Sequence, residues 1–284
     1  MIDINTKVLG LMGYTLAHSL SPRLHNYYIK EHDLNYVYLP FEVKPENFSD
    51  AVVGLKAINF RGVNITIPYK EKIIDHLDSI SEQAQHIGAV NTVVNEDGCL
   101  YGYNTDAPGF IRMLKEDGGF DIEGKKAVII GAGGASKAVG FALCKNGIKE
   151  ILLLNRTPAR ANELVELWQE IYSDVIISYG GLRDDSYREI FKKFHLIIDT
   201  TPVGMAPETD VKPVISPQYL HSDLLIVDLV YNPLETVLIR EAKKLGARTL
   251  NGMSMLLYQG IESFSLWTGI KPEDTGLKNG LFDR

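Results

Sequence analysis

The sequence predicts an α/β protein that contains a doubly wound parallel sheet. Short apolar runs rich in β-branched residues alternate with helical patterns along nearly the whole chain, which is typical of parallel strands joined by helices. Six such runs in the second half have the rhythm of a doubly wound sheet; they lie near residues 127–130, 151–154, 174–178, 196–199, 224–230 and 247–250. The length of 284 residues is enough for two domains.

The N-terminal part supplies a separate series of elements. In chain order we expect a strand over 8–12, a helix from Pro22 to about 31, a strand over 36–43, a helix from Pro45, an alternating strand over 62–67, helical segments to about 87, and a hairpin of 89–94 and 100–103 around 95–98. Thr105 or Asp106 then caps a helix that runs to about 115.

The end of the chain and the glycines suggest the domain organisation. After Asn251 and Gly252 a long helical stretch reaches about residue 267 and is free to pack on the N-terminal elements. We expect a first domain of residues 1–106 that is completed by the helices of 252–284, and a second domain of 107–251. Gly118 and Gly119 mark an expected hinge or linker.

Composition excludes several classes of function. The net charge of −7 argues against a nucleic acid as partner. The two cysteines, Cys99 and Cys144, lack the Cys/His spacing of a zinc site or a disulfide framework, so we expect no metal and a reducing compartment. No apolar run approaches the roughly 20 residues that span a bilayer, and the N-terminus lacks a signal-peptide core. We expect a cytoplasmic enzyme that binds neither nucleic acid nor membrane.

A dinucleotide-binding fingerprint lies in the stretch Lys126-Ala-Val-Ile-Ile-Gly-Ala-Gly-Gly-Ala-Ser136, which has the order strand, glycine turn, helix. Gly131 permits the tight turn, and Gly133 lets the backbone approach a pyrophosphate at the N-terminus of the helix. The third position of the fingerprint is Ser136 instead of glycine or alanine. A plain tight turn is the alternative interpretation, and the next strand favours a cofactor.

The next strand, 151–154, ends at Asn155-Arg156-Thr157 and carries no acid. NAD sites place an Asp or Glu there to bind the ribose 2′-hydroxyl. Arg156, and Arg160 one helical turn later, suit the dianionic 2′-phosphate of NADP. A positive arginine is unfavourable at a helix N-terminus, because it opposes the helix dipole. A bound anion between the arginine and the helix end explains these arginines better than simple solvation does. The sequence therefore predicts NADP over NAD.

Further polar residues lie where strands end, which is where α/β proteins bind ligands. Ser19 and Ser21 precede the helix that Pro22 starts. Ser21 alone could cap that helix, which leaves Ser19 to help receive a carboxylate at the helix N-terminus.

A possible proton-transfer site lies at the strand ends of the N-terminal part. Lys70, Asp106, Asn64 and Asn91 all take such positions, more than chance placement of helix caps explains. A solvated lysine and a helix-capping Asp106 are the plain alternatives. A lysine beside a carboxylate can pass a proton to or from a hydroxyl while hydride goes to nicotinamide.

Together these motifs closely resemble those of the shikimate dehydrogenase family, over nearly the whole chain. The matching stretches are 13–26, 64–70, 88–92, 102–106, 131–136, 155–157, 228–233 and 251–259. The resemblance implies an N-terminal α/β substrate domain and a Rossmann-like doubly wound NADP-binding domain, with the active site in the cleft between them. It implies reversible, NADPH-dependent reduction of 3-dehydroshikimate to shikimate, a step towards aromatic amino acids.

The resemblance also implies roles for single residues. Lys70 and Asp106 form the catalytic pair, and Ser19 and Ser21 take the substrate carboxylate. The residues implied to hold ring hydroxyls are Asn64, Thr66, Asn91, Tyr231 and Gln259, although Tyr231 alone could equally be a core residue. The expected cofactor-binding residues are Gly131, Ala132, Gly133, Gly134, Ala135, Asn155, Arg156, Thr157, Arg160, Thr200, Val230 and Gly252. Ser136 fits the glycine-loop variant of the family.

Two other readings of the function stay open at this point. The stretches 258–262 and 266–269 also look like the quinate/shikimate branch of the family, so quinate is a possible second substrate. A protein of the same fold that senses a nucleotide without turnover is the alternative from another class, and the intact Lys70 and Asp106 argue against it. We expect small-molecule partners and a monomer or homodimer.

Overall fold

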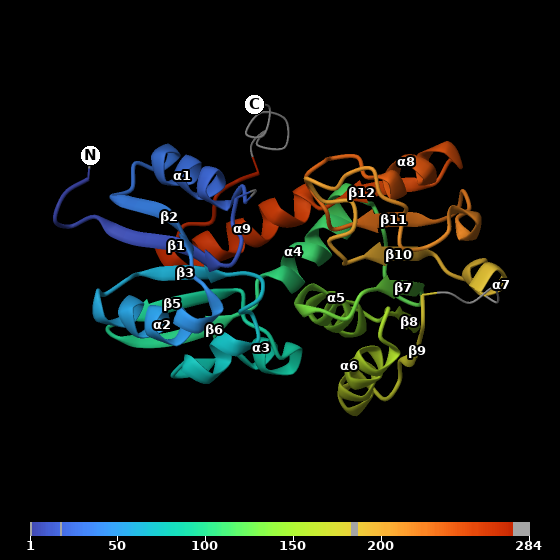
Figure 1. Cartoon of the computed structure of the whole chain (residues 1–284), viewed down its shortest axis with the longest axis horizontal. Helices are drawn as coiled ribbons and strands as arrows, with labels where there is room; N and C mark the ends of the chain where they lie inside the picture. The colour runs from blue at the N-terminus through green and yellow to red at the C-terminus, as the bar shows by residue number, and fades with distance from the viewer. Residues whose placement is uncertain (1, 18, 183–186, 275–284) are drawn as a thin grey trace. The chain divides into compact units, whose positions relative to one another are not determined.

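The computed structural model describes residues 2–17, 19–182 and 187–274. The chain forms two compact units, which we call unit 1 (Met1–Gly109 with Leu257–Arg284) and unit 2 (Phe110–Leu256). The chain passes from unit 1 to unit 2 inside α4 (Asp106–Arg112) and returns inside α9 (Met253–Thr268) (Figure 1). The last ten residues of the predicted C-terminal segment, 275–284, lie outside the described residues.

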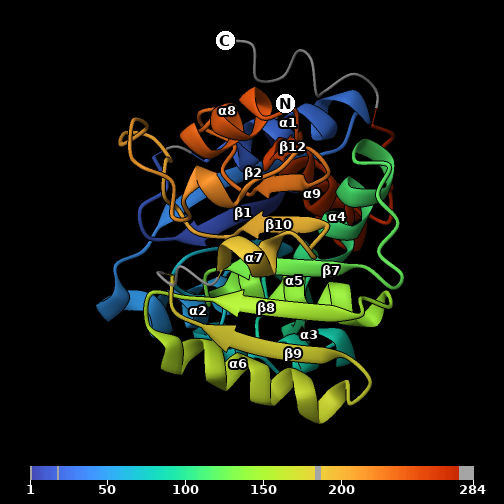
Figure 2. The ribbon, with the colours of Figure 1, turned by 90° about the vertical axis from the view of Figure 1, so that its right-hand side faces the viewer.

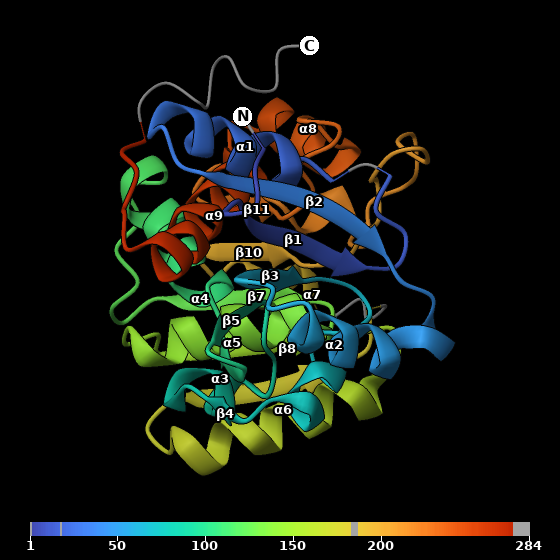
Figure 3. The same cartoon turned by 90° about the vertical axis from the view of Figure 1, so that its left-hand side faces the viewer.

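Unit 1 is built on a mixed sheet of the order β2-β1-β3-β5-β6-β4. Its strands are β1 (Lys7–Gly13), β2 (Tyr36–Glu42), β3 (Gly62–Ile65), β4 (Ser79–Ile80), β5 (Thr92–Glu96) and β6 (Cys99–Tyr103). β1 runs parallel to both β2 and β3, as Figure 3 shows, whereas β5 is antiparallel to both of its neighbours. The helices are α1 (Ser21–Glu31), α2 (Phe48–Ala57) and α3 (Glu82–Ile87), with short turns η1 (Pro45–Asn47) and η2 (Lys72–His76).

Unit 2 is built on a parallel sheet of the order β12-β11-β10-β7-β8-β9 (Figure 2). The strands are β7 (Lys126–Ile130), β8 (Glu150–Leu154), β9 (Ile176–Gly180), β10 (Leu196–Asp199), β11 (Leu225–Asp228) and β12 (Arg248–Asn251). The helices are α5 (Gly134–Lys145), α6 (Pro158–Ile171), α7 (Tyr187–Phe191) and α8 (Val237–Lys244), with the turns η3 (Met113–Asp117) and η4 (Pro217–Tyr219). This order, with its reversal between β7 and β10, confirms the predicted doubly wound sheet.

The register of unit 2 lines up the carboxyl ends of the strands. Ile130 pairs with Asp199 and with Leu154, and Asp199 pairs with Asp228. The four central strands, β7, β8, β10 and β11, are buried and almost purely aliphatic, as expected for strands covered on both faces. Polar residues that follow the strands are therefore brought to one edge, which is where the predicted cofactor residues lie.

Several predicted boundaries are wrong. β3 ends at Ile65, two residues early, because the chain turns before Pro68, which cannot donate to a ladder. The strand expected at 174–178 is shifted to Ile176–Gly180, and the one expected at 224–230 stops at Asp228. The short β4 was not predicted at all.

The hairpin is tighter than predicted. Its first strand spans Thr92–Glu96 and not 89–94, and the connection is the dipeptide Asp97-Gly98. Both residues have positive φ, 52° and 88°. That conformation is a two-residue primed turn, whose twist matches the flanking strands.

The C-terminal helix α9 packs on the sheet of unit 1. Trp267 donates its indole N–H to the carbonyl of Val93 (2.9 Å), and Arg61 Nε donates to the carbonyl of Trp267 (3.0 Å). A Cβ at Gly62 would lie 2.2 Å from the Trp267 ring, so only glycine permits this approach. No helix among residues 2–17, 19–182 and 187–274 is long and apolar enough to cross a membrane.

Candidate active site

Lys70 and Asp106 form an ion pair in unit 1. Lys70 lies in the turn after β3 and Asp106 begins α4, and Nζ is 2.5 Å from Oδ2. The side chains are 18% and 7% exposed, so the pair is largely shielded from water but reachable at the lysine. Asn91 Nδ2 donates to the other oxygen, Oδ1, at 2.9 Å. Both carboxylate oxygens are thus held by donors, which fixes the position of the ammonium.

Asp106 does not cap its own helix. Asn104 Oδ1 accepts from the backbone N–H of Asp106 (3.1 Å) and of Ala107 (3.3 Å), which is the contact of an N-cap side chain. The prediction that Thr105 or Asp106 caps this helix is therefore wrong. Because Asn104 satisfies the helix end, the carboxylate of Asp106 is available to Lys70 and Asn91.

The amide of Asn91 is used on both sides. Its Nδ2 donates to Thr105 Oγ1 and Asp106 Oδ1, each at 2.9 Å, and lies 3.4 Å from Gln259 Oε1. Its Oδ1 accepts from the N–H of Thr105 at 2.7 Å. A ligand hydroxyl that binds Asn91 would have to replace one of these bonds.

The amide of Asn64 is also buried and engaged. Its Oδ1 accepts from the hydroxyl of Tyr38 (2.8 Å), which leaves one lone pair for another donor. Its Nδ2 lies 3.1 Å from the carbonyl of Asn91 and from Ser263 Oγ. Asn64 and Asn91 therefore belong to one network.

Glycines bring α9 close to the other helices of this site. A Cβ at Gly109 of α4 would lie 2.7 Å from the backbone nitrogen of Gln259, and a Cβ at Gly260 would lie 2.5 Å from Leu24 of α1. The structure thus places Gln259 beside the helix that begins with Asp106.

The two serines stand at the start of α1. The N-cap is Leu20 and makes no side-chain hydrogen bond, so the alternative in which Ser21 caps this helix is wrong. Ser21 is the first helical residue, and its N–H lies 3.4 Å from Ser19 Oγ, which is too long for a strong bond. Thr66 is half-buried after β3, and its methyl group lies where a Cβ of Gly13 would be.

The glycine loop of unit 2 has the shape predicted from the fingerprint. Gly131 follows β7 with φ of 104°, a conformation that side chains rarely adopt. Gly133 precedes α5, and among the described residues no heavy atom lies within 4 Å of a Cβ placed there. Ala132, Gly134 and Ala135 complete the turn and the start of α5. The backbone at Gly133 is open to a ligand at a helix N-terminus.

Ser136 closes the loop on the sheet. It is fully buried, its hydroxyl donates to the carbonyl of Gly131 (2.7 Å), and it lies 2.6 Å from Thr200 Oγ1. Thr200 in turn donates to the carbonyl of Ile130 (2.7 Å). A serine at this position is therefore accommodated without exposure, and its hydroxyl ties the glycine loop to the residue after β10.

Of the predicted NADP residues after β8, Asn155 is half-buried and the others are exposed. Asn155 Nδ2 donates to the carbonyl of Thr157 (2.9 Å), which shapes the turn into α6. Arg156 and Arg160 are exposed, the first turn of α6 holds no acid, and neither guanidinium has an ion pair among the residues that the structure describes. This end of α6 carries positive charge that a bound anion would balance.

The sequence matches three family models, described as the shikimate dehydrogenase substrate binding domain (residues 11–93), shikimate / quinate 5-dehydrogenase (113–229) and the shikimate 5′-dehydrogenase C-terminal domain (252–275). A protein of Halothermothrix orenii named shikimate dehydrogenase (NADP(+)) is 55% identical over 96% of this chain and 94% of its own. The chain belongs to the shikimate dehydrogenase family.

Solved structures of this family have the same fold. A shikimate dehydrogenase in complex with NADP+ is 44% identical, with a TM-score of 0.92 over 100% of this chain and 97% of that chain. A shikimate 5-dehydrogenase from Listeria monocytogenes, in complex with shikimate and NAD, is 39% identical, with a TM-score of 0.87 over 95% of this chain and 94% of that chain.

The remaining predicted residues of this family member lie in unit 2. Val230 and Gly252 are neighbours, since the Gly252 N–H donates to the Val230 carbonyl (3.0 Å). A Cβ at Gly252 would lie 2.0 Å from the carbonyl oxygen of Leu229, so no side chain fits there. Tyr231 follows β11 and is half-buried. The structure thus brings Lys70 together with residues of unit 1, while Tyr231 belongs to the other unit.

Sequence reasoning did not single out two buried acids, Asp199 and Asp228, beside the loops predicted to bind the cofactor. Asp199 accepts from the N–H of Thr201 (2.8 Å), and Asp228 accepts from the N–H of Val230 (3.0 Å) and the hydroxyl of Thr236 (2.6 Å). Burial, and then the neighbouring Asp228, raise the pKa of Asp199 to about 7. These carboxyl groups hold the loops that carry Thr200 and Val230.

The sequence did not predict a cluster of three buried hydroxyls in unit 1, of which only Thr105 was singled out, as a helix cap. They belong to Thr92, Thr105 and Ser263, and they connect the amides of Asn64 and Asn91. Helical spacing could have found Ser263, because it follows Gln259 by four residues on the same face of α9.

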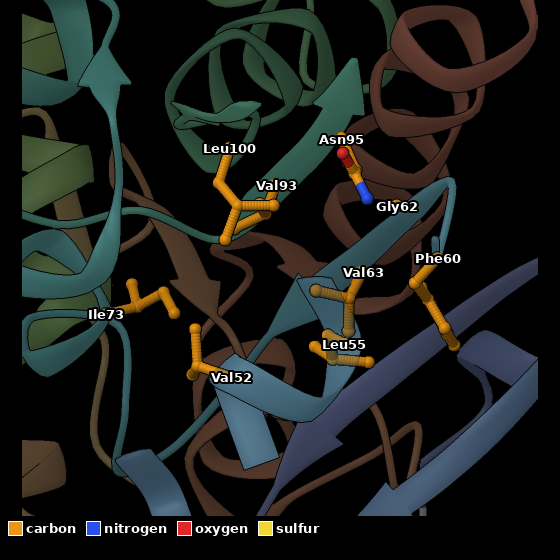
Figure 4. A pocket seen from close by; sticks show the side chains of 9 residues that line it. All are labelled: Val52, Leu55, Phe60, Gly62, Val63, Ile73, Val93, Asn95 and Leu100. Atoms are coloured by element: carbon orange, nitrogen blue, oxygen red, sulfur yellow. The ribbon is translucent and has the colours of Figure 1, made fainter. Parts of the chain in front are cut away.

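A small cavity in the core of unit 1 is a separate feature (Figure 4). Its volume, taken as the space open to the centre of a water molecule, is about 10 Å³, which is room for about one water. Val52, Val63 and Val93 contribute to an otherwise apolar lining, in which Asn95 is the polar exception. Such a lining lacks the donors that a carboxylate and ring hydroxyls need.

Among the described residues no group of His, Cys, Asp or Glu side chains could hold a metal ion.

Proposed function

We propose that this chain catalyses the reversible, NADPH-dependent reduction of 3-dehydroshikimate to shikimate. The observation that carries the proposal is the shielded Lys70–Asp106 pair, 2.5 Å apart, in a chain that belongs to this family and has an NADP-type turn after β8. The name of the Halothermothrix orenii relative supports NADP as the cofactor.

Lys70 is proposed as the proton donor. NADPH, when bound, supplies the hydride that reduces the ring ketone, and the ketone oxygen must gain a proton as it becomes a hydroxyl. The Lys70 ammonium can deliver that proton, and its positive charge stabilises the negative charge that develops on the oxygen. In the reverse direction the same amine takes the proton from the hydroxyl of shikimate.

Asp106 is proposed to orient the lysine and to accept a hydrogen bond from a second ring hydroxyl. Its Oδ2 holds the ammonium and its Oδ1 is held by Asn91. A carboxylate has about four lone-pair directions, so it can accept a substrate hydroxyl without releasing Lys70. The pair thus acts as one positioned unit.

The other roles follow the chemistry of each side chain. Ser19 and Ser21, at a helix start without a side-chain cap, are proposed to receive the substrate carboxylate. The side chains proposed to contact ring hydroxyls are Asn64, Thr66, Asn91, Tyr231 and Gln259. For Asn64 the remaining lone pair of Oδ1 is the acceptor.

The NADP site is proposed to combine the glycine loop with the turn after β8. Gly131, Ala132, Gly133, Gly134 and Ala135 would receive the pyrophosphate at the N-terminus of α5. The residues proposed for the ribose and its 2′-phosphate are Asn155, Arg156, Thr157 and Arg160, and those near the nicotinamide are Thr200, Val230 and Gly252. The guanidinium groups favour a phosphate over a bare hydroxyl.

Both cysteines are free thiols, which supports a reducing compartment, and we propose the cytoplasm. A monomer or a homodimer stays a prediction, as do the predicted domain bounds.

The test is absorbance at 340 nm with shikimate or quinate and with NADP+ or NAD+ in all four combinations. We expect the fastest NADPH formation from shikimate with NADP+. Comparable rates with quinate would place the protein in the dual-substrate class. Binding of NADP+ without turnover of either substrate would overturn the proposal in favour of a nucleotide sensor.

A further inference from the structure

Ser263 lies at the centre of a buried polar cluster in unit 1. It is fully buried on α9, and its Oγ is 2.8 Å from Thr92 Oγ1 and 3.0 Å from Thr105 Oγ1. The same oxygen is 3.1 Å from Asn64 Nδ2 and 3.0 Å from the carbonyl of Gln259. One side chain therefore touches four polar neighbours that come from α9, β3, β5 and the turn before α4.

One pattern gives the hydroxyl protons of Ser263, Thr92 and Thr105 an acceptor each, although it leaves the 3.0 Å contact between Ser263 and Thr105 without a proton. Ser263 donates its proton to the carbonyl of Gln259, and its two lone pairs accept from the hydroxyl of Thr92 and from Asn64 Nδ2. Thr105 then donates to Asn91 Oδ1 (3.2 Å). In this pattern Ser263 is one of three acceptors around Asn64 Nδ2, beside the carbonyl of Asn91 (3.1 Å) and Thr92 Oγ1 (3.2 Å).

The cluster connects two groups that the proposed reaction uses. The Oδ1 atom of Asn64 does not contact Ser263 and accepts a hydrogen bond from the hydroxyl of Tyr38. Thr105 accepts from Asn91 Nδ2 (2.9 Å), and Asn91 in turn holds Asp106. Ser263 therefore has a hydrogen bond with Asn64, whereas Thr105 and Asn91 separate it from the Lys70–Asp106 pair and its contact with Thr105 carries no proton in this pattern.

We propose that Ser263 is a positioning residue, which orients the Asn64 amide for the substrate ring from behind the site. The proposal rests on the proposed function. Because a buried site has little water to replace a lost acceptor, removal of the hydroxyl leaves Asn64 Nδ2 with only the Asn91 carbonyl and Thr92 Oγ1, and the amide shifts towards these two acceptors. The bonds of Asn91 to the N–H of Thr105 and to Asp106 do not involve Ser263, so the catalytic pair is affected less.

A purely structural role is the main alternative. Serine and threonine in helices often donate to the carbonyl four residues back, with little effect on stability. Thr268, on the same helix, makes such a bond to the carbonyl of Phe264 (2.8 Å) and is remote from the amide cluster. Thr268→Ala is therefore a matched control for Ser263→Ala.

The experiment measures kcat, the KM for shikimate, the KM for NADP+ and the melting temperature for the unmodified protein, Ser263→Ala, Ser263→Cys and Thr268→Ala. We expect both Ser263 variants to raise the KM for shikimate about tenfold, as for a buried group left without its partner, with a smaller fall in kcat. The KM for NADP+ should stay within about twofold, and Thr268→Ala should match the unmodified protein in all kinetic constants. Cysteine has the same branching as serine with a larger atom that accepts hydrogen bonds weakly, so it leaves no cavity and tests the role even if the alanine variant is poorly folded.

Two results would overturn the proposal, and they differ from a failure of the proposed function. Unchanged KM for shikimate in folded Ser263 variants removes Ser263 from the site, and an equal change in Thr268→Ala assigns the effect to the helix. If the unmodified protein does not oxidise shikimate, the proposed function itself fails and this role fails with it.

Discussion

Replacing His25 with phenylalanine should make unit 1 less sensitive to acid. His25 lies fully buried on α1, stacked on Tyr38 with ring centroids 4.4 Å apart and packed against Trp267 at 5.1 Å. Burial lowers the pKa of His25 to about 3, and a contact with the Asn64 side chain opposes this effect without overcoming it. The surrounding rings carry no charge near neutral pH, since burial raises the pKa of Tyr38 well above its usual value.

The sign of the effect follows from proton linkage. The unfolded chain takes up a proton on this histidine as the pH falls through about 6.5, while the folded protein resists it until about pH 3. Stability is therefore lost as the pH falls from about 6.5 towards 3. Between pH 7 and pH 5 the loss from this one group is about 2 kcal/mol, because the proton affinity of the unfolded state gains about 1.4 kcal/mol per pH unit below its pKa.

The assay is reversible urea unfolding of the unmodified protein and of His25→Phe at pH 7 and pH 5, with the transition of unit 1 compared if the units unfold separately. Phenylalanine keeps a ring against Tyr38 and cannot be protonated. The double difference is the change in the free energy of unfolding between pH 7 and pH 5 for the unmodified protein minus the same change for the variant. Packing changes that do not depend on pH cancel in it. The contributions of Asp199 and Asp228, whose raised pKa values make stability fall as the pH rises, cancel as well because both proteins contain these acids. The unmodified protein should lose about 2 kcal/mol more than the variant on going to pH 5. A double difference below about 0.5 kcal/mol would show that His25 is protonated as easily in the folded protein as in the unfolded chain, which contradicts its burial.

The remaining predictions concern the site and one close contact. Lys70→Met should lower kcat at least about 10²-fold with a much smaller change in the KM for shikimate; near-normal kcat in a variant with an unchanged melt would remove Lys70 from the mechanism. Arg156→Ala should weaken NADP+ by about 1.5–3 kcal/mol in a binding titration and leave NAD+ nearly unchanged, whereas equal weakening of both would make Arg156 structural. Ser19→Ala should raise the KM for shikimate more than it lowers kcat, because a carboxylate contact is the same in ground and transition states; the reverse would place Ser19 in the chemistry. Gly62→Ala should destabilise unit 1 by about 1–3 kcal/mol in urea, since its Cβ would overlap Trp267, and Gly54→Ala, where a Cβ meets nothing among the described residues, is the control.

The sequence predicted the type and order of most elements because the local signals agree with the fold. Buried parallel strands are continuous apolar runs, and glycines mark the turn at Gly131 with its positive φ. Strand ends were less predictable at 174–178, where the apolar run continues to Ile177 and pairing with β8 sets the limits. The pairing partner is a tertiary choice that periodicity does not contain.

The cap of α4 shows why the sequence could suggest polar residues at a strand end but not their contacts. Asn104, Thr105 and Asp106 are consecutive, and each residue type is a good N-cap. Contacts with residues distant in sequence distinguish the three candidates. Asn91 binds the N–H and hydroxyl of Thr105, and Lys70 binds the carboxylate of Asp106. Once these two side chains are engaged elsewhere, Asn104 is left to satisfy the helix end. A local propensity could therefore name the three candidates but could not assign their roles.

The same limit applies to α9, where helical spacing predicts a shared face but not its neighbours. Gln259, Ser263 and Trp267 follow one another at intervals of four residues, so they lie along one side of the helix. In the fold each meets a different element: Gln259 meets α4 at Gly109, Ser263 meets the Asn64 amide, and Trp267 lies over Gly62. Two of these contacts are close approaches that glycine alone permits, so the glycines determine how near this face of α9 comes to the site. A side chain at either glycine would shift Gln259 and Ser263 together, because both are fixed to one rigid helix.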